Sequence, residues 1–418
     1  MTLYGPFTQV VTMDKLPLRG ALCDEQLEII PNAGILVDDD GFIAEVSDFE
    51  TLQSQKPKSV FQQQSAIALP AFVDSHTHIC FAGNRANDFA MRNAGKSYLE
   101  IAESGGGIWS SVKHTRDASE KQLLDGMLQR IGELISQGIT TIEVKSGYGL
   151  NAENELKMLR VIQEAQKHTP AKLVPTCLAA HTVPKDFSGT SHDYLDYILA
   201  DILPIIKSEN LARRVDIFIE KSAFGIDESR EFLLKAKEMD FELTVHADQF
   251  TSGSSRVAVE VGACSADHLE ATSEEDIDFL AKSETVATAL PGASLGLGEK
   301  FTPARKLLDA GAILAIGTDW NPGSAPMGSL VTQASVLATY QKLTTAEVLS
   351  AMTFRSAKAL NLSDRGVLAQ GKRADFQIYE TDNFLDVLYR QGMLRPAKVV
   401  IGGEVIETLE GKNQDLAI

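Results

Sequence analysis

A short apolar run ends in two histidines in the segment Ala68-Leu-Pro-Ala-Phe-Val-Asp-Ser-His-Thr-His78. Side chains at positions i and i+2 of a β-strand point to the same side, so His76 and His78 can reach one metal ion. Two histidines form only half of a typical metal site, and the other ligands must come from elsewhere in the chain. A packed histidine beside a surface histidine would give the same pattern, so the rest of the sequence decides between the two interpretations.

Short apolar runs rich in β-formers alternate with amphipathic segments from residue 68 onward. The runs lie at 68–75, 139–145, 172–180, 215–220, 242–246, 263–268, 285–290 and 312–318. Helical spacing of apolar residues between them marks the segments 119–137, 153–168, 191–207, 228–239 and 273–282. Because parallel neighbours need such crossovers, eight strand–helix units over about 250 residues predict a closed α/β fold, a (β/α)8 barrel of the TIM type.

The two ends of the chain consist of alternating apolar runs separated by turns. Neither end has enough strands for a stable sheet of its own. We therefore expect residues 1–67 and 364–418 to pair into one small composite β-sandwich domain, beside a barrel domain at 68–363. Helices at 326–340 and 345–361 are expected to complete the barrel side.

Composition excludes several classes of function. The 418 residues carry a formal net charge of −18 and show no basic stripe, which argues against a nucleic-acid partner. An anionic substrate would therefore need its own local arginine or lysine. The 4 cysteines have no CxxC spacing and are expected to be reduced thiols. No apolar run approaches the ~20 residues of a membrane span and no signal peptide is evident, so we expect a cytoplasmic protein without a membrane partner.

Metal-binding side chains follow five of the predicted strands. In a barrel of this type the carboxyl ends of the strands form one rim, where catalytic residues gather. The residues at these ends are His76, His78, His181, His246, His268 and Asp319. Three histidines with one carboxylate suit zinc or ferrous iron. Such an ion lowers the pKa of a bound water to roughly 7 and polarises a carbonyl oxygen, which favours hydrolysis of an amide-like bond.

The chain resembles the amidohydrolase superfamily over essentially its whole length. The matching segments are Phe72-Val-Asp-Ser-His-Thr-His78, Val245-His246-Ala-Asp, Ala266-Asp-His268, Gly317-Thr-Asp319 and Gly366-Val-Leu-Ala-Gln-Gly-Lys-Arg-Ala-Asp375. The resemblance implies one divalent metal, zinc or iron, held by His76, His78, His246 and Asp319. It places His268 near the metal water as a base or hydrogen-bond partner. A bridging carboxylated lysine has no obvious counterpart other than Lys145, so we expect a mononuclear site.

Further segments resemble those members of the superfamily that open a five-membered lactam carrying a propionate tail. They are Phe81-Ala-Gly-Asn-Arg85, Gly105-Gly-Gly-Ile108, Lys145-Ser-Gly-Tyr-Gly-Leu150, Ala180-His181 and Asp319-Trp-Asn-Pro-Gly323. This resemblance implies hydrolysis of 4-imidazolone-5-propanoate to N-formimino-L-glutamate in histidine degradation. The expected partner is thus a small anionic heterocyclic substrate, and the resemblance also implies a homodimer.

A carboxylate tail needs a fixed cation in so acidic a protein. Arg85 follows the metal strand on a loop at the same rim, and its guanidinium can bind a carboxylate bidentately. A surface arginine is the alternative interpretation. A lid near Arg85 is expected from Arg92, Tyr98 and Gly105–Gly107. The polar turn after Asp319 is expected to offer amide and hydroxyl donors to the carboxylate, from Asn321, Gly323 and Ser324.

The ring of the substrate needs partners of its own. The resemblance assigns Tyr148 to substrate contact, although a loop tyrosine can equally be structural. His181 is expected to hydrogen-bond the ring carbonyl and to stabilise the developing oxyanion. His268 and Asp319 are expected to move the proton that the reaction requires.

Position 249 departs from the family pattern. The pattern reads His-x-x-Glu after the fifth strand, whereas this chain reads His246-Ala-Asp-Gln249. An amide cannot carry a proton in turnover, so Gln249 is expected to orient the substrate; an impaired enzyme is the alternative. The missing glutamate also argues against a mononuclear-metal aminohydrolase acting on a purine, pyrimidine or related heterocycle. A non-catalytic scaffold is disfavoured because all four metal ligands are present.

Overall fold

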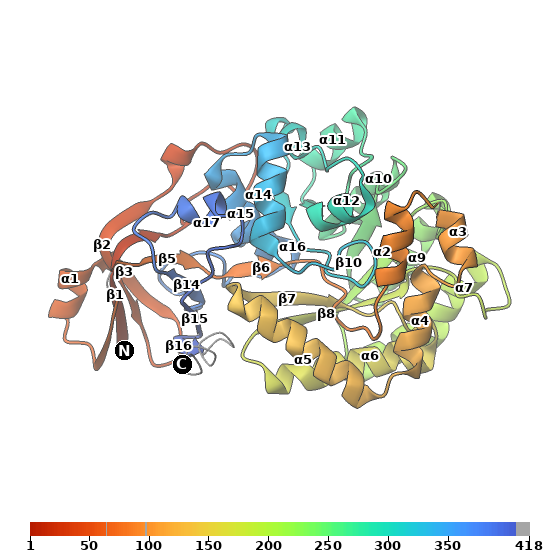
Figure 1. Cartoon of the computed structure of the whole chain (residues 1–418), viewed down its shortest axis with the longest axis horizontal. Coiled ribbons are helices and arrows are strands. Elements are labelled where there is room, and N and C mark those ends of the chain that lie inside the picture. The colour runs from red at the N-terminus through yellow and green to blue at the C-terminus, as the bar shows by residue number, and fades with distance from the viewer. Residues whose placement is uncertain (64, 97, 407–418) are drawn as a thin grey trace.

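The computed structural model describes residues 1–63, 65–96 and 98–406 and contains two eight-stranded sheets (Figure 1). One sheet is parallel throughout and follows chain order. Its strands are β6 (Phe72–Asp74), β7 (Ile139–Lys145), β8 (Lys172–Ala180), β9 (Arg214–Phe218), β10 (Glu242–Ala247), β11 (Ser265–His268), β12 (Val286–Ala289) and β13 (Leu314–Ile316). The eight predicted runs thus correspond to these eight strands, with ends shifted by a few residues.

The parallel sheet closes between its first and last strands. Beyond β6 and β13, Thr77 and Trp320 form a parallel bridge, and the His78 N–H donates to the Trp320 carbonyl over 2.9 Å. Below this bridge, the Thr318 hydroxyl donates to Asp74 Oδ2 over 2.6 Å. The predicted (β/α)8 barrel is therefore confirmed, and its closure fixes the metal-binding segment against the strand end that carries Asp319.

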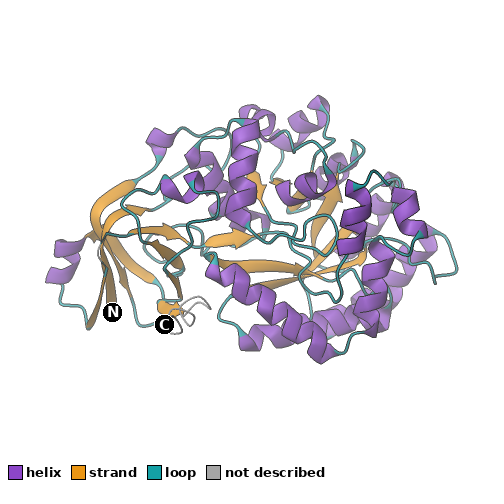
Figure 2. Cartoon of the chain, viewed as in Figure 1, coloured by secondary structure: helices purple, strands orange, loops and turns teal. Residues whose placement is uncertain are grey.

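Helices cover the outside of the barrel (Figure 2). The predicted segments appear as α5 (Glu120–Ser136), α6 (Ala152–Ala165), α7 (Ser191–Tyr197), α8 (Leu203–Ser208), α9 (Ile226–Glu238), α11 (Glu274–Ala281), α14 (Leu330–Gln341), α15 (Thr345–Met352) and α16 (Phe354–Ala359). Shorter helices were not predicted: α2 (Ala86–Asn93), α3 (Tyr98–Glu103), α4 (Ile108–Asp117), α10 (Ser254–Val261), α12 (Pro291–Leu297) and α13 (Ala304–Ala310). With both faces covered, β7 is buried at all 7 positions.

The second sheet combines both ends of the chain and lies at the left in Figure 1. Its strands are β1 (Thr2–Val11), β2 (Ile29–Val37), β3 (Ile43–Asp48), β4 (Ser59–Gln62), β5 (Ile67–Pro70), β14 (Phe376–Tyr379), β15 (Lys398–Ile401) and β16 (Glu404–Ile406), with the short helix α1 (Phe49–Ser54) beside them. The composite sheet was expected. The division into a sandwich domain and a barrel domain at the predicted boundaries stays a prediction, and residues 407–418 lie outside the described range.

The run expected as one strand at 68–75 is in fact two strands. β5 pairs with β1 and β14 in the terminal sheet, whereas β6 pairs with β7 in the barrel. Pro70 ends β5 because proline has no N–H to continue a ladder. Between the strands, the Ala71 N–H donates to the Asp375 carbonyl, and the Phe72 N–H donates to the Gly138 carbonyl. One apolar run thus feeds both sheets and links the terminal sheet to the metal-binding segment.

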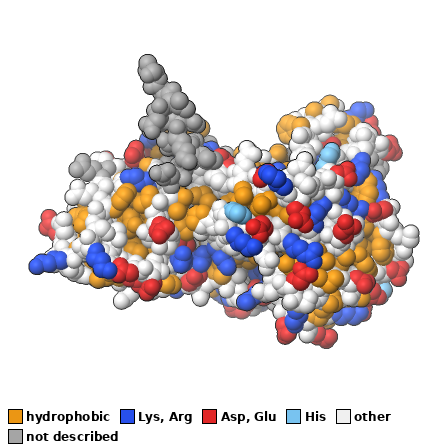
Figure 3. All heavy atoms as spheres, turned by 90° about the horizontal axis from the view of Figure 1, so that it is seen from below, with side chains coloured by type: hydrophobic (Ala, Val, Ile, Leu, Met, Phe, Trp, Pro, Cys, Tyr) orange, Lys and Arg blue, Asp and Glu red, His pale blue; other side chains and the backbone are white. Residues whose placement is uncertain are grey.

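Charged side chains of both signs are mixed on one face of the molecule. Figure 3 shows Lys and Arg interspersed with Asp and Glu on the face that it presents. None of the helices within the described ranges is long and apolar enough to span a membrane. The four cysteines, Cys23, Cys80, Cys177 and Cys264, are free thiols, as expected.

Candidate active site

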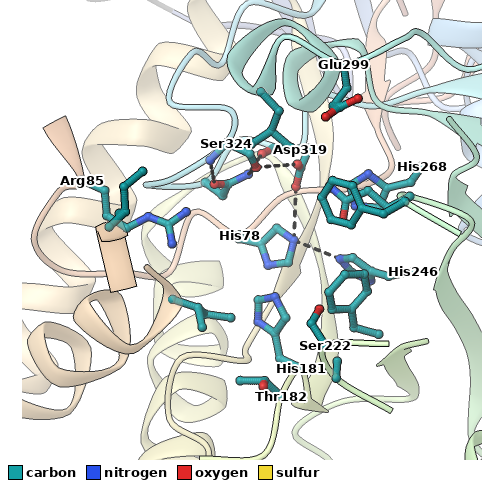
Figure 4. A pocket seen from close by; sticks show the side chains of 18 of the residues that line it. His78, Arg85, His181, Thr182, Ser222, His246, His268, Glu299, Asp319 and Ser324 are labelled. Carbon is teal, nitrogen blue, oxygen red and sulfur yellow. Dashed lines mark hydrogen bonds and ion pairs between the residues drawn. The ribbon is translucent and has the colours of Figure 1, made fainter. Parts of the chain in front are cut away.

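The six predicted rim residues lie together at the carboxyl end of the barrel. Five of them line a cavity of about 480 Å³, namely His78, His181, His246, His268 and Asp319. The sixth, His76, lies fully buried beneath the cavity, with its ring centroid 4.5 Å from that of His246. Figure 4 shows the side chains converging from separate strand ends. His268 and Asp319 reach the cavity from backbone with positive φ, 85° and 51°, a costly conformation typical of functional sites.

Four side chains place possible ligand atoms close together at the position predicted for the metal. His78 Nε2 lies 3.2 Å from His76 Nε2, 3.3 Å from His246 Nε2 and 3.3 Å from Asp319 Oδ1. Zinc lies about 2.0–2.1 Å from its nitrogen ligands, so two ligands of a tetrahedral site are separated by about 3.3 Å. Burial lowers the pKa of His78 to about 3 and that of His76 well below its usual value, so both rings are neutral and offer lone pairs.

Buried carboxylates orient two of these histidines. Asp267 Oδ2 lies 2.7 Å from His76 Nδ1, and Asp216 Oδ2 lies 2.9 Å from His246 Nδ1. A carboxylate at Nδ1 keeps the proton there and turns the lone pair of Nε2 toward the metal position. Sequence reasoning missed both aspartates. The available signal was a charged residue within an apolar strand, in Val215-Asp-Ile and in Ala266-Asp-His268.

A buried lysine holds these carboxylates together. Lys145 Nζ lies 2.7 Å from Glu143 Oε1, 2.8 Å from Asp216 Oδ2 and 3.9 Å from Asp267 Oδ2. Burial alone would lower the pKa of Lys145, but the facing carboxylates raise it above its usual value. The amine is therefore a charged ammonium, and a carbamate bridge requires a neutral amine. Lys145 is thus part of a buried ion-pair network, and the mononuclear site stays the prediction.

The hydrogen bond of His181 changes its expected role. Its Nδ1 lies 3.0 Å from the Gly147 carbonyl, which can only accept, so Nδ1 carries the proton. Burial lowers the pKa of His181 well below its usual value, and the ring is neutral. Nε2 therefore presents a lone pair to the cavity. In this state Nε2 can accept a hydrogen bond, whereas the predicted role at an oxyanion would require it to donate one.

Tyr148 lies on a loop that a buried glutamate fixes. Its ring centroid is 5.6 Å from that of His181 and 6.0 Å from that of His78. Glu155 Oε1, from α6, accepts the N–H groups of Gly149 and Leu150, each over 2.8 Å. Burial raises the pKa of Tyr148, so its hydroxyl is a proton donor at the cavity. Glu155 is a further residue that sequence reasoning missed.

The turn after Asp319 is saturated by its own hydrogen bonds. Asn321 Oδ1 accepts the N–H groups of Gly323 and Ser324 over 2.7 and 2.8 Å. Asn321 Nδ2 donates to the Asp319 carbonyl and to Ser324 Oγ over 2.7 and 2.9 Å. These groups thus form the turn, and Asn321 also lines the cavity; binding of substrate by Asn321 and the Gly323 amide stays a prediction. The Ser324 hydroxyl donates to Asp319 Oδ2 over 3.5 Å.

Arg85, Arg92 and Gln249 line the cavity, as expected, and Arg85 points its guanidinium inward in Figure 4. The backbone after Gln249 is fixed by Glu220, whose Oε2 accepts the N–H groups of residues 250 and 251 over 3.1 and 3.0 Å. The side chain of Tyr98, which was expected in the lid, lies outside the described residues.

Glu270 Oε1 lies 3.6 Å from His268 Nδ1. Burial alone would lower the pKa of His268, but this carboxylate raises it above its usual value.

The barrel, with its histidine and aspartate rim, defines a metal-dependent hydrolase fold. The model of the Amidohydrolase family matches residues 67–406, so the chain belongs to this family. Among curated proteins it is 40% identical to an imidazolonepropionase of Bacillus cytotoxicus over 390 residues, which cover 92% of each chain. It is 39% identical to the imidazolonepropionase of Bacillus cereus over 412 residues, or 97% of each chain.

Solved structures share the fold at low sequence identity. Atrazine chlorohydrolase TrzN from Arthrobacter aurescens TC1, complexed with zinc, superposes with a TM-score of 0.74 at 19% identity, covering 98% of this chain and 96% of that one. Guanine deaminase from E. coli gives a TM-score of 0.74 at 16% identity, covering 98% of this chain and all of that one (100%). These likenesses show the fold, and the substrate has to be argued from the cavity.

Proposed function

We propose that this chain hydrolyses the ring amide of 4-imidazolone-5-propanoate to N-formimino-L-glutamate, a step of histidine degradation. The observation that carries the proposal is one cavity that has clustered His and Asp side chains at its base and the Arg85 guanidinium at its side. Relatives named imidazolonepropionase, at 39–40% identity over nearly the full length, support the same substrate. The cytoplasmic location and the homodimer expected from the sequence stay predictions.

One divalent metal per chain, zinc or iron, belongs to the proposal. His76, His78, His246 and Asp319 would hold it. His78 Nε2 lies 3.2–3.3 Å from a ligand atom of each of the other three, and buried carboxylates orient two of the rings. When bound, such an ion lowers the pKa of water and polarises a carbonyl oxygen. Zinc and iron both accept this ligand set, so metal analysis has to distinguish them.

The cavity can bind the substrate by its two ends. Arg85 would pair with the propionate, as a planar guanidinium matches a carboxylate in a fixed geometry. His181 Nε2 would accept the N–H of the ring, and the Tyr148 hydroxyl would donate to the substrate. Gln249 would hydrogen-bond the ring without exchanging a proton, because an amide does not titrate in the working range.

The reaction forms one C–O bond, breaks one C–N bond and moves one proton from water to the departing ring nitrogen. His268 is the proposed proton carrier. One of its ring nitrogens faces Glu270, which favours the protonated ring, and the other is available to the cavity. Asp319 is proposed to support this transfer. Its Oδ1 faces His78, and its Oδ2 faces Ser324. A proton carrier placed in this way typically raises the rate of such reactions by about 10²- to 10⁴-fold.

The proposal is tested by elemental analysis of the purified chain combined with loss of imidazolone propionate absorbance. We expect about one zinc or iron per chain and hydrolysis without release of ammonia. Metal without hydrolysis, together with ammonia release from a purine or pyrimidine, would replace the proposal by the aminohydrolase alternative. A folded chain that takes up no metal from zinc- or iron-supplemented buffer would overturn the mechanism.

A further inference from the structure

The guanidinium of Arg85 occupies the place where a side chain of residue 323 would begin. A Cβ atom built on Gly323 would lie 1.2 Å from Nη2 of Arg85 and 2.0 Å from its Cζ. The φ angle of Gly323 is outside the positive range, so any L-residue can adopt this backbone conformation. The chain therefore needs glycine at this position for space and not for the turn.

The surface under the guanidinium is rigid. The N–H of Gly323 donates to Asn321 Oδ1, and Asn321 is itself bonded to the Asp319 carbonyl. On the other side of the turn, a Cβ at Gly296 of α12 would lie 1.7 Å from the Ser324 carbonyl oxygen, so α12 and the turn are in close contact. Gly323 thus cannot retreat from a larger neighbour.

The other side of Arg85 faces Asp88, which is in turn contacted by the glycine run Gly105–Gly107. Asp88 Oδ2, on α2, lies 3.7 Å from Arg85 Nε and accepts the N–H of Gly107 over 2.8 Å. A Cβ at Gly106 would lie 2.3 Å from Asp88 Oδ1, so this glycine leaves room for the carboxylate. Arg85 is therefore held between Asp88 and Gly323, with its side chain 17% exposed.

The geometry points to Gly323 as a positioning residue for carboxylate recognition: its bare Cα is the seat that holds the Arg85 guanidinium in the cavity. The inference rests on the proposed function for the role of Arg85. A guanidinium that is already fixed loses little further freedom on binding, so the seat strengthens the preference for an anionic tail. A methyl group at 323 meets only the far end of a flexible side chain in its first contacts. Substitution should therefore displace Arg85 and leave the fold intact.

The test compares G323A, R85A and the double variant on two substrates, 4-imidazolone-5-propanoate and its uncharged propanamide. A charge-assisted hydrogen bond is worth about ten- to hundredfold in binding, so R85A should lower kcat/KM for the carboxylate by that factor, chiefly through KM. G323A should lower it by at least about tenfold, and the double variant should be no worse than R85A. In both single variants kcat/KM should fall more for the carboxylate than for the propanamide, so that the ratio of the two values drops by at least about tenfold.

The matched control is G126A, inside α5, where a Cβ would meet its nearest atom at 3.5 Å and φ is not positive. It should behave as the wild type on both substrates. Unchanged carboxylate activity in G323A would overturn the inference. Losses that multiply in the double variant would overturn it too, because they mean that the two residues act independently. An equal loss on both substrates would show general damage to the site and would also overturn it.

Binding of 3-(imidazol-4-yl)propanoate, measured by calorimetry, separates this inference from the proposed function. If the wild type hydrolyses neither 4-imidazolone-5-propanoate nor its propanamide, the proposed function fails, but the role of Gly323 in positioning Arg85 can still be tested. Weaker binding of the probe by both R85A and G323A, with no further loss in the double variant, would support this role. Binding by G323A that equals the wild type, when R85A has lost it, would overturn it.

Discussion

The metal side and the carboxylate side of the cavity are built on opposite plans. On the metal side, ligands at strand ends are supported by buried charges on the strands themselves, such as Asp216, Asp267 and Lys145. On the carboxylate side, Arg85 comes from a loop outside the barrel and is placed by glycines and one helix carboxylate. On the metal side, buried charges on the strands fix the histidines at the proposed reaction centre. On the carboxylate side, contacts from loops and glycines place Arg85, which is proposed to select an anionic substrate.

The largest effect is expected at the centre of the cavity. His268→Ala should lower kcat by about 10²-fold or more, because it removes the proposed proton carrier, while the metal content stays at the wild-type level. Steady-state kinetics and elemental analysis of the same preparation measure both quantities. Near-normal kcat would remove His268 from proton transfer, and loss of the metal would move it into the ligand set.

Lys145→Met tests whether the metal side depends on buried charge. The substitution leaves Glu143 and Asp216 buried without their cation, and removing one partner of a buried ion pair costs about 3–5 kcal/mol. Urea unfolding of the metal-free protein should show this loss. Lys121→Met, at an 81% exposed side chain paired only with Asp125, is the control and should change stability by less than about 1 kcal/mol. Equal stability of the two variants would contradict the proposed support.

Asp216→Asn should weaken metal binding by about 10- to 100-fold, because the amide no longer holds the proton of His246 at Nδ1. Competition with a chelator measures the affinity directly. The control is Asp227→Asn, whose side chain is 98% exposed on α9. If metal affinity is unchanged in Asp216→Asn, the tautomer of His246 is set by something other than this carboxylate.

The order of strands and the six rim residues could be predicted because both follow from local spacing. Strand period and crossover length locate the carboxyl end of each strand, and one barrel then brings His181, His246 and Asp319 to one rim. The division of the run at 68–75 could not be predicted, since it depends on pairing with β14, about 300 residues further along the chain.

It was harder to predict what each residue does in the site than to predict which residues lie there. Asn321 has the chemistry of a substrate ligand, but its side chain satisfies the backbone of its own turn, as asparagine commonly does. The tautomer of His181 depends on the Gly147 carbonyl, which only the folded loop brings within reach. Asp216 and Asp267 lie within apolar strands, where sequence alone does not reveal which side chain faces them.

The smallest effect is expected where the carboxylate side meets α12. Arg92 Nη1 donates to the Gly296 carbonyl, and this bond ties α2 to α12, whose Gly296 packs against Ser324. The bond is partly exposed, so its loss in Arg92→Ala is worth about 1 kcal/mol, or about fivefold in KM for the carboxylate, with kcat unchanged. Arg160→Ala, which breaks an exposed pair with Glu209 far from the cavity, is the control.

A kcat loss in Arg92→Ala, measured at saturating substrate, would break the distinction between the two sides. It would mean that α2 acts on the reacting groups and not only on the entry of the carboxylate. An unchanged KM would show instead that Asp88 and Gly323 hold Arg85 without help from α2–α12 contact. The expected result, a modest rise in KM alone, assigns substrate selection to the loops and leaves the chemistry to the strands.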